Sequence, residues 1–227
     1  MVNYAVDPAV LTPLVPSGTE LDTHQGRTFL SVVAFRFLRT RLLGIPIPFH
    51  RNFEEMNLRF YVRRDVAGEV RRAVVFVKEI VPRRGIAALA RAVYNEPYVA
   101  LPMRSRVEGS PPIVDYGWRC AGRWQRLSAR AVGPATLPES GSHEEFISDH
   151  LWGYTRQRDG GTIEYRVAHP SWQVWRATDF RLEADFNDLY GPTLAGTLKQ
   201  PASVFIAAGS EVTVYRPRRL RLTQGAA

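Results

Sequence analysis

The chain has 227 residues, of which 45% are hydrophobic and 23% charged, and this balance indicates one folded domain over residues 1–227 and excludes a disordered or fibrous protein. The net charge is +8, but all except two of the 30 basic residues are arginines scattered along the chain, so we expect no nucleic-acid partner. Cys120 is the only cysteine, which excludes an intramolecular disulfide, and no apolar run reaches membrane-spanning length; we therefore expect a cytoplasmic protein without a membrane partner.

The first third of the chain is predicted to form a short helix and two hairpins. Asp7 followed by Pro8 predicts a helix start, since the carboxylate caps free N–H groups and proline suits the first helical position. The stretch "GTELD" and residues 27–43 are predicted strands, joined as a hairpin by "THQG". Residues 57–63 and 70–81 are predicted to form the second hairpin, with "DVAGE" between them.

The middle of the chain is predicted to hold the clearest helix. Residues 85–95 have good helix formers with apolar residues at helical spacing, and Asn95 and Pro97 end the pattern. A further hairpin is predicted around Ala121-Gly122, between "VDYGWRC" and "RWQRLSARAVG".

The last third alternates between predicted helices and strands. Ser142 and Glu145 form a capping-box pattern that predicts a helix over residues 143–151. Strands are predicted at residues 161–169, 202–209 and 211–217, with a short helix near 186–191. We therefore expect a β-rich α+β fold, with a mostly antiparallel sheet that closes into a barrel and a few short helices.

Four motifs in this order carry a resemblance to a known family: "GRTFLSVVAFRFLRTRLLGIPIPFHRNFEEMNLRFYVRRD", "YNEPYVALPM", "SHEEFISDHLWGY" and "VAHPSW". With these motifs, nearly the whole chain resembles the family called domain of unknown function 2071, or YqjF-like. The resemblance implies a fold related to acetoacetate decarboxylase, which is a conical, largely antiparallel β-barrel with an internal cavity. It implies no activity, because the family has none established.

Acetoacetate decarboxylase acts through a lysine pair, one of which forms a Schiff base with the substrate. By resemblance, Glu55 matches a glutamate of that enzyme, while Glu96, Pro97 and Tyr98 take the place of the lysine pair. None of these three residues forms a Schiff base, so we expect no decarboxylase chemistry of that kind.

One face of the strand that follows Glu55 is predicted to carry a ligand site. Alternation places Glu55, Asn57, Arg59 and Tyr61 on one face and four apolar residues on the other, so Glu54 points away from Glu55. If the polar face points into a cavity, Arg59 suits a carboxylate ligand and Glu55 suits a general acid/base; if it points to water, the face is only solvated.

Other candidate ligand residues come from outside this strand. Tyr94, Asn95 and Tyr98 lie beside the place of the missing lysines, and their alternative role is helix termination and packing. His150 is expected on the predicted helix beside Phe146 and Ile147, and His169 after a strand; both are candidate ligand contacts. The histidine spacing predicts no metal site, although convergence of His50, His150 and His169 is an alternative. No nucleotide-binding motif is present, so we expect no cofactor.

These observations support three hypotheses. The first is a protein that binds a small organic ligand, such as a carboxylate, in an internal barrel cavity without Schiff-base chemistry. The second is an enzyme that uses Glu55 as a general acid/base on a carbonyl or carboxylate compound. The third is a non-catalytic structural or interaction module whose cavity its own side chains fill. The sequence gives no indication of an oligomeric state.

Overall fold

The computed structural model describes residues 1–38, 41–42, 45–46 and 52–220. Its helices are α1 (Pro8–Leu11), a 3₁₀ turn η1 (Thr12–Leu14), α2 (Arg84–Tyr94), α3 (His143–Ser148) and α4 (Asn187–Ala195). The first strands are β1 (Val2–Val6), β2 (Glu20–Leu21), β3 (Thr28–Phe37), β4 (Arg41–Leu42), β5 (Ile45–Pro46), β6 (Phe53–Val66), β7 (Glu69–Val81) and β8 (Tyr98–Ala100). The later strands are β9 (Met103–Glu108), β10 (Ile113–Cys120), β11 (Arg123–Thr136), β12 (Trp152–Arg156), β13 (Thr162–Ala168), β14 (Val174–Glu183), β15 (Ser203–Ala207), β16 (Thr213–Val214) and β17 (Arg218–Arg219).

Most strands belong to one large sheet with the order β16-β13-β12-β7-β6-β3-β1-β15-β14-β11-β10-β9. Its pairings are antiparallel, apart from β7 with β12 and β7 with β8. β8 and β12 pair with different parts of β7, so the sheet forks there. The predicted β-rich α+β fold with a mostly antiparallel sheet is confirmed.

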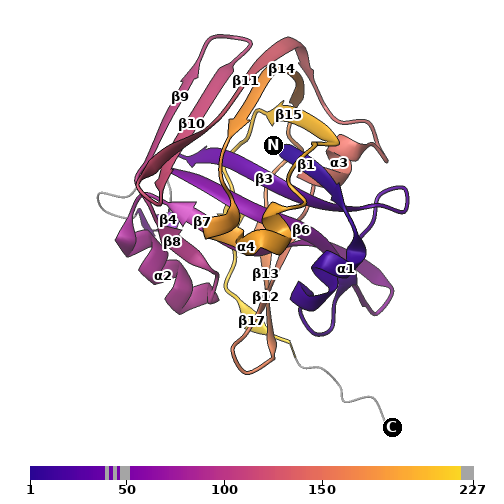
Figure 1. Ribbon diagram of the computed structural model, residues 1–227. Coiled ribbons are helices and arrows are strands. Elements are labelled where there is room, and N and C mark those ends of the chain that lie inside the picture. The colour runs from indigo at the N-terminus through magenta and orange to yellow at the C-terminus, as the bar shows by residue number, and fades with distance from the viewer. Residues whose placement is uncertain (39–40, 43–44, 47–51, 221–227) are drawn as a thin grey trace.

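The sheet curls on itself without closing within the described residues. Its end strand β9 returns to β6, where Ser105 donates a hydrogen bond of 2.9 Å to Glu54 from across the curl. β9 and β6 are not paired as strands, so the prediction of a closed barrel is wrong in this detail. Because β9 and β6 share a side-chain contact but no backbone hydrogen bonds between strands, the curled sheet stays open between them (Figure 1).

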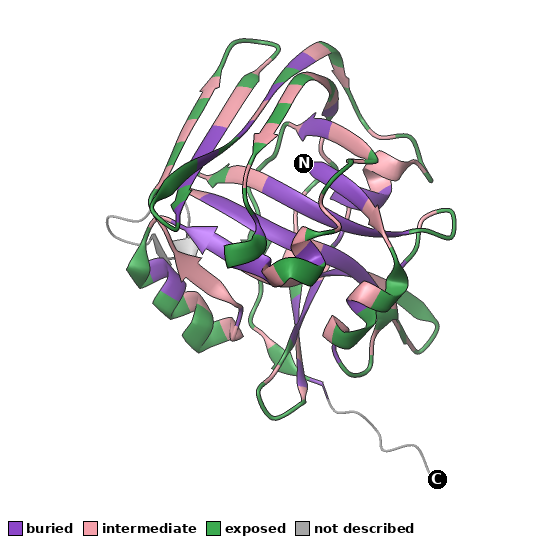
Figure 2. Ribbon diagram, viewed as in Figure 1, coloured by how far each residue is buried: buried purple, intermediate pink, exposed green. Residues whose placement is uncertain are grey.

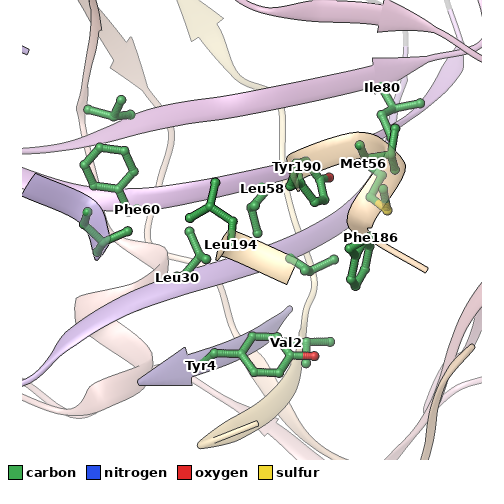
Figure 3. Close-up of a cluster of buried hydrophobic side chains, with 14 of the residues drawn as sticks. Val2, Tyr4, Leu30, Met56, Leu58, Phe60, Ile80, Phe186, Tyr190 and Leu194 are labelled. Carbon is green, nitrogen blue, oxygen red and sulfur yellow. The ribbon is translucent and has the colours of Figure 1, made fainter. Parts of the chain in front are cut away.

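The inside of the curl is filled by an apolar core. Its central strands supply Leu30, Met56, Leu58 and Phe60, and β10 supplies Trp118; all of these are fully buried. α4 crosses this face of the sheet and packs Tyr190 and Leu194 onto it, together with Phe186, which precedes the helix (Figure 3). Leu189 of α4 belongs to the same core. These side chains form the core inside the curl.

α4 fits this space because it is kinked. Gly191 has a φ of 77° and Pro192 follows it, so two short helical turns meet at a bend. A positive φ is tolerated at glycine because it lacks a Cβ.

The outer face of the central strands is also buried (Figure 2). At one end of it, α2 packs Ile86 and Ala87 against Phe53 and Val81. At the other end, α3 packs Phe146 and Ile147 against neighbours that include Tyr61. Between these two apolar clusters the outer face of β6 and β7 is polar, although it is buried.

Several local predictions agree with the structure. Asp7 caps α1 by accepting a hydrogen bond of 2.8 Å from the Ala9 amide. β6 with β7 and β10 with β11 form the predicted hairpins, and α2 ends at Asn95 in the left-handed conformation.

Three local predictions are wrong. The stretch at Glu20 pairs with β6, where Arg63 forms an ion pair with Glu20 at 2.8 Å, while β3 pairs with β1 and β6; the predicted first hairpin does not form. The strand expected over residues 27–43 ends at Phe37 as β3, and residues 39–40 and 43 lie outside the described part. The predicted helix over 143–151 ends at Ser148, so His150 follows the helix and does not belong to it.

None of the helices in the described part of the chain has the length and apolar character needed to cross a lipid bilayer.

Candidate functional site

Strand pairing brings three polar side chains into one row. Asn57 of β6 pairs with Glu79 of β7 in the antiparallel ladder, and Glu79 pairs with Tyr98 of β8 in the parallel one. Paired residues on neighbouring strands point to the same face, so these three side chains lie side by side. They lie on the outer face, opposite the core.

Glu55 lies two residues before Asn57 on β6 and therefore points to the same face as this row. Its side chain is 2% exposed, accepts a hydrogen bond of 2.9 Å from the Tyr98 hydroxyl and one of 3.1 Å from the Asn57 amide. Burial disfavours the charged form and raises the pKa of Glu55 to about 7, against the opposing effects of these hydrogen bonds and of Arg59. Glu55 therefore changes its protonation state near neutral pH.

Glu79 is the carboxyl with the strongest tendency to remain protonated. The Tyr98 hydroxyl is shared between Glu55 and Glu79, and its single proton is donated to Glu55. A hydrogen bond between Glu79 and the same oxygen then needs a proton on Glu79. Burial and the charges of Glu96 and Glu55 raise the pKa of Glu79 well above its ordinary value, against the lowering effect of the Tyr98 hydrogen bond, so the protonated form of Glu79 is favoured.

Glu96 enters from the loop between α2 and β8. Thr155 and Tyr165, on β12 and β13, both donate to one of its carboxylate oxygens, at 2.5 and 2.9 Å. Burial, with a smaller contribution from the charge of Glu55, raises the pKa of Glu96 to about 7, against the lowering effect of the hydrogen bonds from Thr155 and Tyr165. We call Glu55, Glu79 and Glu96 the carboxyl cluster.

The ring of Tyr165 reaches Glu96 because Gly153 leaves room for it. A Cβ on Gly153 would lie 2.2 Å from the Tyr165 ring, so any larger residue would displace the ring. Position 153 therefore helps to fix the donor to Glu96.

The carboxyl cluster continues along β6 into a cationic region. Arg59 donates a hydrogen bond of 2.9 Å to the Ile147 carbonyl, and its charge lowers the pKa of both Glu55 and His150. The His150 ring lies 4.8 Å from that of Tyr61, and the Tyr61 hydroxyl donates to Ser31 at 2.8 Å. Burial is the main cause that lowers the pKa of His150 well below its ordinary value, so this histidine is neutral at pH 7.

We call the carboxyl cluster together with Asn57, Arg59 and His150 the polar layer. Several of its buried atoms have no hydrogen-bond partner among the described residues: one oxygen each of Glu79, Glu96 and Asn57, Nε of Arg59 and both ring nitrogens of His150. Buried polar atoms in folded proteins are rarely left unpaired, and exceptions mark places where a ligand or water completes the site. Acidic, cationic and neutral basic groups thus lie along one strand face.

The polar layer is not arranged as a metal site. Within the described residues, no three His, Cys, Asp or Glu side chains are placed to hold a metal ion. His50, named as a possible ligand, lies outside the described residues.

The structure brings together six of the nine residues selected from the sequence. Glu55, Asn57, Arg59, Tyr61, Tyr98 and His150 line the outer face of the central strands. Their role in binding stays a prediction. This face is buried, so the alternative of a solvated strand face is wrong, but it is the outer face, so the alternative that it points into a cavity inside the barrel is wrong as well. Glu54 points away from Glu55, as predicted.

The other three selected residues lie outside the polar layer. Tyr94 contacts the Tyr165 ring edge-on at 5.3 Å, and the Asn95 side chain reaches the Arg156 carbonyl at 3.4 Å. His169 stacks on Trp172 at 4.2 Å in an exposed loop. Of these, only Tyr94 is linked to the carboxyl cluster, through Tyr165.

The sequence reasoning did not select Glu79, Tyr165 or Thr155. Glu79 was considered only as the neighbour of Lys78, and the structure places the two on opposite faces: the Lys78 ammonium donates to the Leu189 carbonyl of α4, inside the curl. The signal available was a glutamate in an apolar strand at a position that pairs with Asn57. Tyr165 and Thr155 lie in strands with no local sign of a partner.

Comparisons with known proteins agree with this architecture. Residues 1–211 match the family model DUF2071, described as an uncharacterized conserved protein. The uncharacterized protein YqjF of Bacillus subtilis (strain 168) is 28% identical over 199 residues, which cover 85% of this chain and 78% of the relative.

Solved structures show the same fold at low sequence identity. Acetoacetate decarboxylase from Legionella pneumophila superposes with a TM-score of 0.63 at 10% identity, covering 97% of this chain and 83% of that one. The enduracididine biosynthesis enzyme MppR, in complex with pyruvate, gives 0.62 at 12% identity, covering 96% and 86%. An acetoacetate decarboxylase-like enzyme from Sphingomonas wittichii RW1 gives 0.58 at 13% identity, covering 96% and 89%. The predicted relation to the acetoacetate decarboxylase fold is confirmed.

Proposed function

The chain belongs to the DUF2071 family of uncharacterized conserved proteins, and from this membership and the polar layer we propose that it binds a small organic carboxylate and uses Glu55 as a general acid/base. The observation that carries the proposal is Glu55 itself: a buried carboxyl with a pKa of about 7, hydrogen-bonded to Tyr98 and Asn57 beside the Arg59 charge. A group that titrates near the working pH is best suited to both take and return a proton.

Arg59 is the proposed anchor for the ligand carboxylate. A guanidinium binds a carboxylate through two parallel hydrogen bonds, and Arg59 uses one terminal nitrogen on the Ile147 carbonyl while its Nε has no partner among the described residues. A carboxylate there replaces none of the hydrogen bonds that hold Glu55.

The structural relatives support the ligand class. MppR, which shares the fold, has been solved with pyruvate, a small 2-oxo carboxylate. A compound of this class offers a carboxylate for Arg59 to bind, and its carbonyl acidifies the neighbouring C–H groups, from which Glu55 could remove a proton. We therefore propose small 2-oxo carboxylates as the ligands to test first.

Pyruvate should raise the melting temperature of the protein, with sodium chloride of equal ionic strength as the control. A ligand at 100 times its dissociation constant adds about 2.7 kcal/mol to the free energy of unfolding. Arg59→Ala should remove this increase, since it deletes the anchor. Arg63→Ala, an exposed arginine on the same strand, should retain it.

A flat melting temperature with pyruvate, acetoacetate and related acids would contradict the binding proposal. It would favour the third hypothesis, a structural module, which the apolar filling inside the curl also suits. Equal shifts in wild type and Arg59→Ala would place the ligand elsewhere.

The mass of the protein should stay unchanged after incubation with acetoacetate and borohydride. Borohydride reduction traps a lysine Schiff base, and this requires an unprotonated amine next to the ligand. Lys78 faces α4 on the other side of the sheet from Glu55, and Lys199 is exposed. Mass spectrometry of the reduced sample tests this, and a stoichiometric adduct on Lys78 would show that chemistry takes place inside the curl.

A further inference from the structure

β12, β13 and β17 lie together at one end of the sheet (Figure 1). Residues of β12, β13 and the C-terminal segment line a pocket there. Its volume is about 510 Å³, within the range of small-molecule sites. We call it the basic pocket; its principal lining residues are Arg71, Trp152, Arg166, Tyr215, Arg216 and Arg218.

Two of its arginines are fixed in place by a buried carboxylate. Glu164 is 6% exposed and accepts from Arg71 and from Arg218, each at 3.3 Å. This pairing neutralises Glu164 and holds the two guanidinium groups at the pocket wall. It leaves the wall positively charged, because one carboxylate faces two arginines.

The other two arginines have no carboxylate partner in the described part of the chain. Arg166 and Arg216 are both exposed, and neither takes part in an ion pair among the described residues. Glu69 is the one acidic residue in the lining, and its ion-pair partner is Arg71, at 3.9 Å. The pocket therefore presents an excess of positive charge to a ligand.

Aromatic rings alternate with these charges. Arg71 lies 4.1 Å from the Trp152 ring centroid, and Arg166 lies 5.7 Å from that of Tyr215. The Tyr215 side chain is 47% exposed, so part of this apolar wall faces the pocket opening. Rings beside guanidinium groups favour a ligand that combines a planar ring with negative charge.

The C-terminal segment supplies three of the nine lining residues. Tyr215, Arg216 and Arg218 all lie beyond residue 211, where the match to the family model ends. β16 and β17 hold this segment against β13 by antiparallel pairing. The pocket is thus built partly from residues outside the family match.

We propose that the basic pocket binds a planar aromatic anion, a ring that carries a phosphate or a carboxylate. The anionic group pairs with Arg166 and Arg216, and the ring lies against Trp152 and Tyr215. This site adjoins the polar layer, because Tyr165 lines the basic pocket and donates to Glu96, but it does not depend on the acid/base role of Glu55.

Isothermal titration calorimetry with four probes tests the site. Adenosine monophosphate and 1-naphthoate, which combine ring and charge, should bind, and whichever binds more tightly identifies the anionic group preferred. Adenosine and inorganic phosphate should each bind at least about tenfold more weakly than adenosine monophosphate, because each offers only one of the two features. Phosphate that binds as tightly as adenosine monophosphate would overturn the role of the rings.

The variant Arg166→Ala/Arg216→Ala should weaken adenosine monophosphate binding by at least about tenfold. Arg106→Ala, an exposed arginine on β9 at the opposite end of the sheet, is the matched control and should leave binding unchanged. Equal binding by the double variant and wild type, absence of binding to wild type by either ring-bearing anion at millimolar concentration, or tighter binding of a single-stranded oligonucleotide would overturn the proposal.

Discussion

Glu55→Gln should greatly slow the exchange of pyruvate methyl protons for deuterium that we expect the wild-type protein to catalyse in D₂O. In the proposed step, the Glu55 carboxylate removes a proton from the methyl carbon, the C–H electron pair forms the enolate and the carbonyl electrons move to oxygen. The proton on the Glu55 carboxyl then exchanges with D₂O, and transfer of the deuteron from Glu55 to the methyl carbon re-forms the carbonyl and completes the exchange. Glutamine keeps the shape of the side chain but accepts no proton, so the rate should fall by about 10²- to 10⁴-fold.

The pH dependence gives this prediction a second readout. The base must be ionised, and burial raises the pKa of Glu55 to about 7, so the wild-type exchange rate should rise with pH up to about 7 and level off above it. Proton NMR of the methyl signal measures both quantities. Glu54→Gln is the control, because it changes the adjacent carboxylate on the opposite face of the same strand.

Two outcomes would contradict the catalytic role. Unchanged exchange in Glu55→Gln would remove Glu55 from the chemistry. Exchange by the wild type no faster than in buffer would exclude general-base action on pyruvate, while the melting-temperature experiment would still decide separately whether the carboxylate binds.

The parts of the fold that could be predicted depend on neighbours in the sequence. The hairpin of β6 and β7 follows from alternation on either side of "DVAGE", and α2 from helical spacing that ends at Asn95. The pairing of Glu20 with Arg63 could not be predicted, because a two-residue strand carries no signal for a partner some forty residues away. Whether β9 pairs with β6 depends likewise on how strands far apart in the sequence come together, so the open edge between them could not be predicted.

In the candidate site, too, the features set by neighbouring residues could be predicted and those set by strand pairing could not. Alternation along β6 correctly separated Glu55 from Glu54 and grouped Glu55 with Asn57. β7, however, has one extra residue opposite the step from Leu58 to Arg59, and this bulge sets the register that pairs Asn57 with Glu79. A bulge of this kind inverts the alternation beyond it, so the place of Glu79 in the site could not be read from its strand alone.

As the pH rises, the stability of Glu79→Gln should increase relative to that of the wild-type protein. The folded-state pKa of Glu79 lies well above its ordinary value of 4.5, so the stability that its proton supplies is fully present below pH 4.5 and is lost progressively as the pH rises toward the folded pKa. Glutamine has no proton to lose. The free energy of unfolding of Glu79→Gln minus that of wild type should therefore increase as the pH rises from 4.5 toward the folded pKa, by at most about 1.4 kcal/mol per pH unit.

Taking the difference between the two proteins isolates this carboxyl from groups that titrate in the same range with the opposite sign. His150 and His143 have lowered pKa values, so they destabilise the fold as the pH falls below about 6.5, and they do so in both proteins. Urea unfolding at several pH values measures the difference, with Glu54→Gln as the control on the opposite face. A pH-independent difference for Glu79→Gln would mean that Glu79 is ionised in the folded protein, and the assignment of its proton toward Tyr98 would then be wrong.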